Sequence, residues 1–223
     1  PEMLAGKTII SAIKGLILTE SCLLNDYLAH HFNINTHQYV AISGPCHAEE
    51  VALERLSYLT FSGLDQELTT AIAKLFENEY IKTIVNHDTN GAQYAAVLKN
   101  IYAVGAGIAN GLGYGDNFLS VYVTNCFKEM AIFLEAQYQD EAEREAPNYN
   151  TSAYLGDLLV TCYSAHSRNR TFGSLVGKGY FVKSATSEMN MVAEGYYAVA
   201  GMKVIIDQLN IKMPIVQAIY ECL

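Results

Sequence analysis

The sequence predicts an α/β region followed by an all-helical domain, and two observations support this. Over about the first 85 residues, short β-branched segments alternate with segments whose apolar residues recur at helical spacing. After Asn90 the alternation stops and only helical spacing follows. We therefore expect two domains, at residues 1–87 and 88–223, with a mostly parallel sheet in the first.

Four strands and three helices are expected in the first region. The strands are short apolar segments bounded by glycine or polar residues, at 7–13, 38–43, 57–62 and 80–85. The helices are expected at 19–32, with Thr19 or Ser21 as the cap, from 47 to 51, and at 65–77. No G-x-G-x-x-G opens the region, so it corresponds to the C-terminal half of a Rossmann-like sheet without the first half.

The second region contains only helical patterns. We expect helices at 91–108, 117–137, 158–163, 170–176, 192–209 and 214–223. The most polar stretch, 140–150, is expected to be a solvated helix end and loop.

Composition and charge exclude several classes of function. The net charge of −9 argues against nucleic acid as a partner, because phosphate backbones need a basic face. The longest apolar run is far shorter than the roughly 20 residues of a membrane span, so no membrane insertion is expected. The five cysteines are scattered without C-x-x-C pairs, which indicates free thiols in a reducing cytoplasm. No histidine lies in a zinc-type spacing, so no metal site is expected.

Lys99 is the one charged side chain of the predicted helix 91–108. Its neighbours at three and four positions are small or aromatic, so no carboxylate on the same helix can pair with it. A partly buried lysine with a lowered pKa can act as a general acid or base. The alternative is a lysine at the edge of a packed helix whose amine reaches solvent.

Glycines are concentrated between Gly105 and Gly115. The run superficially resembles a dinucleotide-binding loop. However, the preceding segment is helical and no Lys-Ser or Lys-Thr follows, as a phosphate loop requires. The sequence therefore favours close helix packing followed by a turn.

A polar cluster follows the short helix at 158–163. Asp157 can cap that helix and shares a face with Thr161, four residues on. The run Ser167-Arg168-Asn169-Arg170 places two guanidinium groups, a hydroxyl and an amide within four residues. Such a cluster can bind a phosphate, and the alternative is an ordinary polar helix start.

Seven segments together resemble one family, bacterial NAD(P)-dependent glycerol-3-phosphate dehydrogenase. They occur in the family's order and extend over nearly the whole chain: 11–15 (SAIKG), 43–51 (SGPCHAEEV), 98–100 (LKN), 105–117 (GAGIANGLGYGDN), 156–162 (GDLLVTC), 167–173 (SRNRTFG) and 192–195 (VAEG). Each segment is weakly specific alone, but seven in order are highly specific.

The resemblance implies a fold and a reaction. The family pairs an N-terminal Rossmann domain with an all-helical C-terminal domain, similar to that of 6-phosphogluconate dehydrogenase, and binds substrate between them. The implied reaction reduces dihydroxyacetone phosphate to sn-glycerol 3-phosphate with NADH or NADPH, for glycerophospholipid synthesis. The apolar helices of the second region also lead us to expect a homodimer.

The resemblance also implies roles for individual residues. Lys99 corresponds to the catalytic acid that protonates the carbonyl oxygen. The implied substrate-binding residues are Lys14, Gly44, Cys46, Lys99, Asp157, Ser167, Arg168 and Asn169, with Arg168 and Asn169 on the phosphate. The implied cofactor-binding residues are Lys14, Ala48, Arg168, Val192 and Glu194.

Two features depart from the family's pattern. Cys46 and His47 stand where the family usually has Ser and Phe, and a thiol is a poorer hydrogen-bond donor than a hydroxyl. The glycine-rich fingerprint is absent, so from the family's layout we expect that roughly 80 to 100 residues of the family's N-terminal region are not part of this sequence. We therefore expect this chain alone to bind NAD(P)H poorly and to turn over little.

Two other functions are compatible with the pattern. A β-hydroxyacid or sugar-nucleotide dehydrogenase also pairs a Rossmann domain with a helical domain and uses a helix-borne Lys-Asn. The Ser-Arg-Asn-Arg cluster favours the phosphotriose enzyme over these. A helical oligomerisation module without chemistry is the other alternative, and it predicts that Lys99→Met leaves turnover intact.

Overall fold

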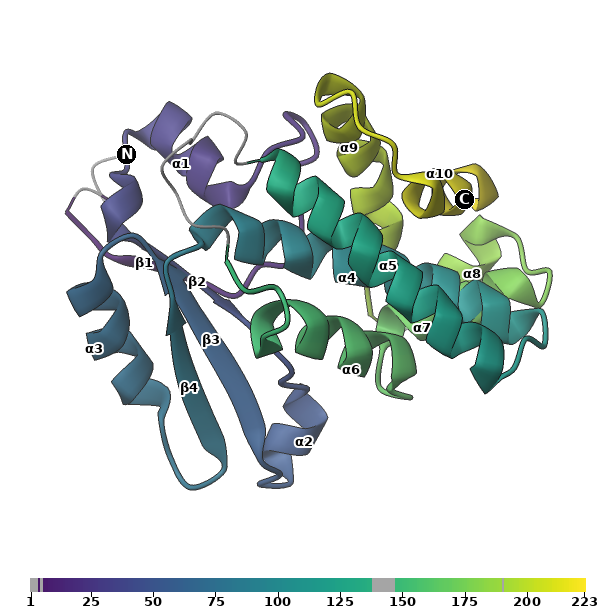
Figure 1. Ribbon diagram of the computed structural model, residues 1–223, viewed down its shortest axis with the longest axis horizontal. Helices are drawn as coiled ribbons and strands as arrows, with labels where there is room; N and C mark the ends of the chain where they lie inside the picture. Colours follow the sequence, from purple (N-terminus) through teal and green to yellow (C-terminus); the bar gives the residue numbers. More distant parts are fainter. Residues whose placement is uncertain (1–3, 5, 138–146, 190) are drawn as a thin grey trace.

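The computed structural model describes residue 4 and residues 6–137, 147–189 and 191–223. A four-stranded sheet lies at one end, and a bundle of helices extends away from it (Figure 1). This agrees with the predicted α/β region followed by helices.

The sheet contains β1 (Ile9–Ser11), β2 (Tyr39–Ser43), β3 (Ser57–Gly63) and β4 (Ile81–Asn86), in that spatial order. β1 pairs parallel with β2, and β3 with β4, but β2 and β3 are antiparallel. The prediction of parallel pairing was wrong for this central pair. The connection holds only α2 (Ala48–Ala52), and a short connection lets the chain return antiparallel, whereas parallel strands need a longer crossover.

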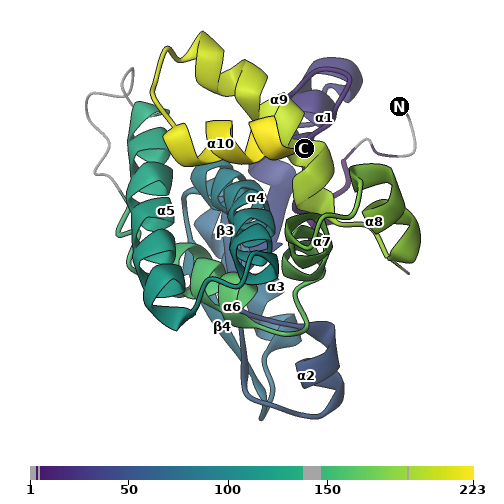
Figure 2. The same ribbon diagram turned by 90° about the vertical axis from the view of Figure 1, so that its right-hand side faces the viewer.

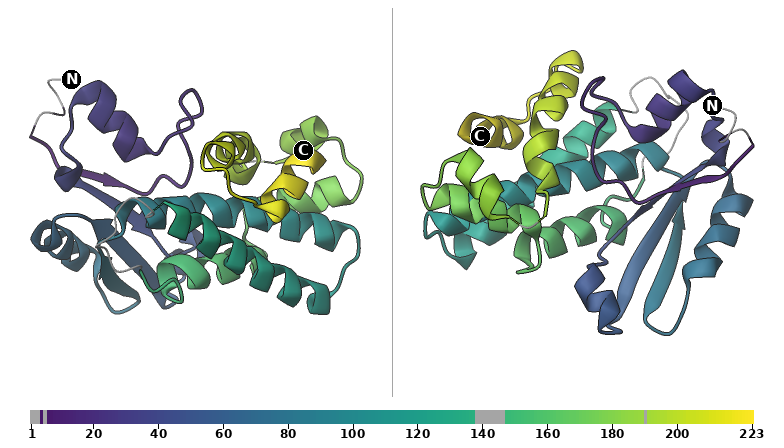
Figure 3. Two further views of the ribbon diagram at one scale, coloured as in Figure 1. Left: turned by 45° about the horizontal axis from the view of Figure 1, so that its top comes forward. Right: turned by 180° about the vertical axis from the view of Figure 1, so that it is seen from behind.

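The α/β region also contains helices α1 (Leu24–Phe32) and α3 (Gln66–Phe76). Helix α3 packs against β3 and β4, on the side of the sheet away from the helical bundle (Figure 3). The Asp65 side chain caps α3 by accepting from Leu68 N at 3.0 Å. The predicted cap of α1 was wrong, since α1 follows Leu23 and has no side-chain cap. Ser21 lies before the helix with a positive φ of 50°, and Cys22 forms an isolated bridge with Ile17.

Helix α4 (Thr89–Gly111) is the centre of the second half. The Asp88 side chain caps it by accepting from Gly91 N at 2.8 Å. The helices that pack against α4, seen around it in Figure 2, are α5 (Asp116–Ala136), α6 (Asp157–Tyr163), α7 (Arg168–Gly177), α9 (Glu194–Gln208) and α10 (Pro214–Cys222). The main hydrophobic core forms between these helices, while a smaller one lies between the sheet and α3.

The predicted helices of this half are confirmed with shifted ends, and two elements were not predicted. These are α8 (Val182–Glu188) and the π-helical turn η3 (Ser152–Gly156), directly before α6. Most of the predicted helix end and loop at 140–150 lies outside the described residues, and 147–150 are not helical.

The glycine run packs α4 against α7, as the sequence favoured. A Cβ on Gly107 would overlap the carbonyl oxygen of Arg170, and one on Gly173 would overlap that of Val104. Because the obstacles are backbone atoms, the two helices could approach this closely only with glycine at these positions. The contact brings the N-terminus of α7 beside the middle of α4.

Candidate active site

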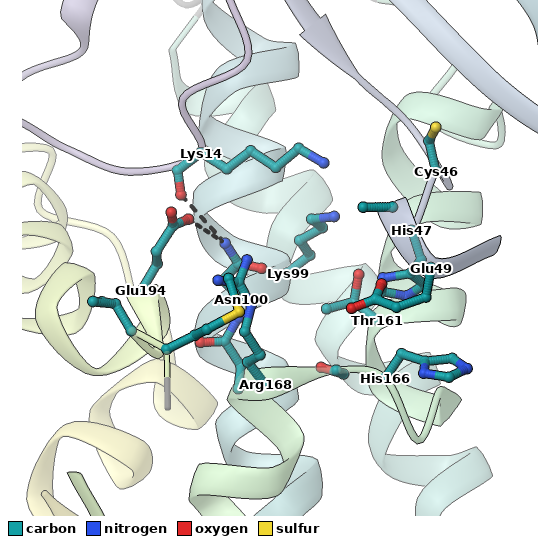
Figure 4. A pocket seen from close by; sticks show the side chains of 15 residues that line it. Lys14, Cys46, His47, Glu49, Lys99, Asn100, Thr161, His166, Arg168 and Glu194 are labelled. Atoms are coloured by element: carbon teal, nitrogen blue, oxygen red, sulfur yellow. Dashed lines mark hydrogen bonds between the residues drawn. The ribbon is translucent and has the colours of Figure 1, made fainter. Parts of the chain in front are cut away.

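A cavity of about 240 Å³ opens where the loops after β1 and β2 meet the middle of α4 and the N-terminus of α7. Figure 4 shows the Lys14 and Lys99 side chains between Cys46 and His47 on one side and Asn100 and Glu194 on the other. Nine of the eleven predicted site residues line this cavity: Lys14, Cys46, Ala48, Lys99, Ser167, Arg168, Asn169, Val192 and Glu194. The other two, Gly44 and Asp157, lie directly behind Lys99.

Lys99 has a partner that its own helix does not provide. Its Nζ lies 2.5 Å from Oδ1 of Asp157 on α6, and both side chains are almost fully buried. The backbone N–H of Gly44 donates to the other carboxylate oxygen at 3.3 Å. The expectation that Asp157 caps its helix was wrong, because its carboxylate is used by this pair and Gly156 is the N-cap residue.

Burial and neighbouring charge determine the proton affinity of this pair. Burial lowers the pKa of Lys99 from 10.5 to about 8; the Lys14 charge adds to this effect and the Asp157 carboxylate opposes it. Burial alone would raise the pKa of Asp157, but the charges of Lys99 and Lys14 lower it below 3.8 overall. At neutral pH the pair is therefore an ammonium and a carboxylate. An ammonium with a pKa near 8 gives up its proton more readily than an ordinary lysine.

Asn100 links three elements beside Lys99. Its Nδ2 lies 3.3 Å from the Lys14 carbonyl oxygen and 3.3 Å from Oε2 of Glu194 on α9. These contacts hold the loop after β1 and the start of α9 next to the catalytic candidate. The position of Asn100 directly after Lys99 was the sequence feature that could have identified it as a site residue.

The N-terminus of α7 supplies the second polar group of the cavity. Ser167 is the N-cap residue and accepts from Arg170 N at 3.3 Å. Asn169 also lines the cavity, and its side-chain oxygen accepts from Gly195 N at 2.9 Å, so the group that it can still offer to a ligand is its NH₂ donor. Arg168 lines the cavity and forms no ion pair within the described part of the chain. The positive end of the helix dipole adds to its charge, so this corner suits an anion.

The predicted pair of guanidinium groups is separated in the structure. Arg170 points away from the cavity, and its Nη2 donates to Asn110 of α4 at 3.4 Å. Thr161 lines the cavity and donates to the Asp157 carbonyl oxygen at 2.5 Å. Five further lining residues were absent from the predicted site: Asn100, His47, Glu49, His166 and Met191. Of the five, the sequence drew attention to Asn100, beside Lys99, and to His47, which departs from the family's pattern, whereas the others depend on tertiary placement.

No group of three or more His, Cys, Asp or Glu in the described ranges could hold a metal ion. None of the helices in the described part is long and apolar enough to cross a membrane.

Comparison with known proteins relates this geometry to a family. The model described as the NAD-dependent glycerol-3-phosphate dehydrogenase C-terminus matches residues 88–223, and that of the N-terminus matches residues 2–69. The chain belongs to the NAD-dependent glycerol-3-phosphate dehydrogenase family. The family suggested by the seven sequence segments is thereby confirmed.

Named relatives and solved structures agree with this family. Glycerol-3-phosphate dehydrogenase [NAD(P)+] of Staphylococcus carnosus is 38% identical over 182 residues, covering 82% of this chain and 53% of the relative. The relative from Staphylococcus aureus strain JH9 is 32% identical, and the alignment covers 100% of this chain and 66% of the relative. The chain thus spans about half to two-thirds of the length of these relatives.

Two solved structures share the fold. Glycerol-3-phosphate dehydrogenase from Coxiella burnetii superposes with a TM-score of 0.87 at 26% identity, covering 97% of this chain and 64% of that one. The enzyme from Saccharomyces cerevisiae superposes with a TM-score of 0.76 at 24% identity, covering 99% of this chain and 66% of that one. At this identity the likeness supports the fold alone.

Proposed function

We propose that this chain carries the substrate-binding and acid-catalytic part of an enzyme that reduces dihydroxyacetone phosphate to sn-glycerol 3-phosphate with NADH or NADPH, for glycerophospholipid synthesis. The observation that supports this most directly is one cavity lined by a buried lysine ammonium and by an arginine at a helix N-terminus that forms no ion pair with the described residues. The first suits a developing alkoxide and the second suits a phosphate.

Substrate binding is assigned to both sides of the cavity. Arg168 and the Asn169 NH₂ group would bind the phosphate, together with the N-terminus of α7 and Ser167. Lys14, Cys46 and the backbone at Gly44 would lie along the remainder of the triose. A cavity of about 240 Å³ is of the size expected for so small a ligand.

Lys99 is assigned the proton transfer. As the carbonyl carbon is reduced, negative charge builds on its oxygen, and the Lys99 ammonium stabilises that charge and donates its proton. Asp157 keeps Lys99 charged and oriented while staying behind it. The nearby Lys14 charge adds to the stabilisation of the oxyanion.

The residues present fit the nicotinamide end of the cofactor. Met191 and Val192 present apolar side chains, while Glu194 and Asn100 place polar groups beside them. Lys14, Ala48, Arg168, Val192 and Glu194 would hold NAD or NADP. A bound reduced nicotinamide supplies the hydride.

The proposal is tested first by binding. Calorimetric titration of the chain with sn-glycerol 3-phosphate should show binding that Arg168→Gln weakens about ten- to a hundred-fold, as expected for a charge-assisted hydrogen bond. Arg170→Gln, two residues along and outside the cavity, is the matched control and should bind as wild type. Glycerol, which lacks the phosphate, should not bind. Equal effects of the two variants would contradict the assignment of the phosphate site.

The same proposal is tested by chemistry. NADH and NADPH oxidation is followed with dihydroxyacetone phosphate, β-keto acids and oxidised sugar nucleotides as competing substrates. We expect a preference for dihydroxyacetone phosphate and a loss of about 10²- to 10⁴-fold in Lys99→Met. Preference for another substrate would favour the alternative dehydrogenases, and turnover intact in Lys99→Met would favour the oligomerisation module.

Three broader features belong to this proposal. The domain boundary is placed between residues 87 and 88, just before α4. All five cysteines are free, which supports a reducing cytoplasm as the compartment. Exposed apolar side chains on α5, namely Phe118, Val121 and Ile132, support a homodimer.

A further inference from the structure

Two histidines line the cavity on the side away from Asn100 and Glu194 (Figure 4). His47 is the N-cap residue of α2, and His166 lies in the loop between α6 and α7. Their ring centroids are 6.3 Å apart, with the rings tilted by 55°. One histidine thus comes from the sheet half and the other from the helical half. Neither has a role in the proposed reaction.

His47 carries a polar atom that the protein leaves unused. Its ring is half-buried, and Nε2 is fully buried with no hydrogen-bond partner among the described residues. A buried nitrogen without a partner is costly, and most such atoms in folded proteins are satisfied. His47 lines the cavity, but Nε2 itself is shielded, so a rotation of the ring toward the cavity would be needed for a bound anion to supply the missing partner.

Several charged groups lie near His47. Lys99 faces it from α4 and Asp157 from α6, while Glu49 and Glu50 lie on its own helix. Lys14 and His166 complete the nearby wall. Burial lowers the pKa of His47 below 6.5, and Lys99 adds to that effect, whereas the three carboxylates oppose it. The imidazole is therefore neutral at pH 7 when no ligand is bound.

A dianion in the cavity changes this balance. Two negative charges inside a half-enclosed space favour the protonated imidazole, since they offset the repulsion from Lys99. Protonation also turns both ring nitrogens into donors, so that Nε2 can donate to an anionic oxygen.

We propose that His47 is a further residue of the anion site, which takes up one proton from solvent when a phosphate-type dianion binds. The inference rests on the proposed function in assigning the anion to a phosphate monoester. His166 is more exposed than His47, so solvent screens its ring more strongly from a charge in the cavity. Substrate binding would then tighten as the pH falls from about 8 toward 6, as long as the phosphate itself stays dianionic.

The probe is sulfate, because its charge stays constant over the pH range in which a phosphate monoester titrates. The His47 imidazole resonance is followed by NMR from pH 5 to 8, with and without saturating sulfate. We expect sulfate to raise the pKa of His47 by about one unit or more. The resonance of His37, which precedes β2 outside the cavity, is the internal reference.

Proton uptake gives a second measurement. Sulfate binding is measured near pH 7 by calorimetry in two buffers of different ionisation enthalpy, at a pH where Lys99 is already largely protonated. Wild type and His166→Gln should each take up a substantial fraction of a proton, and His47→Gln close to none. Sulfate affinity of His47→Gln should also be less dependent on pH than that of wild type.

The outcomes separate this inference from the proposed function. Sulfate binding that depends on Arg168 but leaves the His47 titration and the proton uptake unchanged would overturn the inference and leave the phosphate site standing. Equal loss of proton uptake in His47→Gln and His166→Gln would overturn the assignment to His47. No Arg168-dependent sulfate binding would overturn the anion site itself.

Discussion

Lys99 and Asp157 form a charge pair that the rest of the chain isolates from water. Their side chains are 5% and 2% exposed. A buried pair of this kind is held by its mutual attraction against the loss of hydration of both groups. Removing one partner therefore leaves an uncompensated charge in the interior. A second pair, Lys203 with Asp207, lies one turn apart on the surface of α9 and offers a direct comparison.

Asp157→Asn should destabilise the chain by about 3 to 5 kcal/mol, because Lys99 would remain buried without its counter-charge. The pKa of Lys99 should also fall below about 8, since the carboxylate now raises it. Urea unfolding measures the first effect, and the pH dependence of Lys99 acylation, followed by mass spectrometry, measures the second.

Asp207→Asn is the matched control for that change. It removes a carboxylate from an exposed Lys–Asp pair and should cost at most about 0.5 kcal/mol. Similar losses in the two variants, or an unchanged pH dependence of Lys99 acylation in Asp157→Asn, would contradict the view that burial makes the first pair distinct.

Among the elements, the contact of α4 with α7 determines the geometry of the site. Glycines on both helices meet the backbone of the partner helix, namely Gly107 and Gly111 on α4 and Gly173 and Gly177 on α7. The same contact brings the start of α7, with Arg168 and Asn169, beside Lys99. A separation of the helices would therefore move the proposed phosphate-binding residues away from Lys99.

Gly173→Ala should destabilise the chain by about 1 to 3 kcal/mol or more, because the new methyl group would overlap the carbonyl of Val104. Gly156→Ala is the control, since its backbone is helical and the nearest atom beyond its chain neighbours and its own helix backbone lies 3.7 Å from the added carbon. That variant should be neutral or more stable by up to about 1 kcal/mol. Thermal and urea unfolding measure both. Equal stability of the two variants would show that the helices can move apart freely.

Strong periodicity made most of these elements predictable. The helices around α4 follow continuous apolar patterns, and the glycine run was recognised as packing because no strand precedes it. Helix α8 was not predicted, because its sequence VKSATSE has little apolar periodicity. The antiparallel pairing of β2 and β3 was also missed, since strand direction depends on the path of the connection.

The residues of the site were largely predictable from the sequence, but the contacts between them were not. Ordered motifs identified the residues that now share one cavity, although local spacing alone left Lys99 without a partner. Asp157 lies 58 residues further along the chain, and no periodicity reports a contact of that separation. The proximity of the His47 and His166 rings likewise depends on how the sheet packs against the helices, which the local sequence does not report.

At the scale of the whole molecule, the buried core contains many groups that ionise only at high pH. Burial raises the pKa of Tyr94, Tyr149 and Cys162 to about 12. It also raises the pKa values of four further core groups: Tyr102, Tyr122, Tyr154 and Cys126. In the unfolded chain these groups lose their protons near 9.0 for cysteine and 10.0 for tyrosine. Lys99 behaves oppositely, because its pKa is lowered in the folded state.

These shifts predict that the free energy of unfolding falls as the pH rises above about 9. Between the unfolded and folded pKa values, the native state binds more protons than the unfolded state at each tyrosine and cysteine, so stability decreases with pH. Lys99 contributes the reverse sign between pH 8 and 10.5, but it is one group against at least seven among the described residues. Urea unfolding at pH 7, 8, 9 and 10, with a reductant present, measures the trend. Lys99→Met isolates the opposing contribution: the stability of wild type relative to this variant should increase between pH 8 and 10. A free energy that stays constant to pH 10 would mean that the core phenols and thiols ionise as readily in the native state as in the unfolded chain.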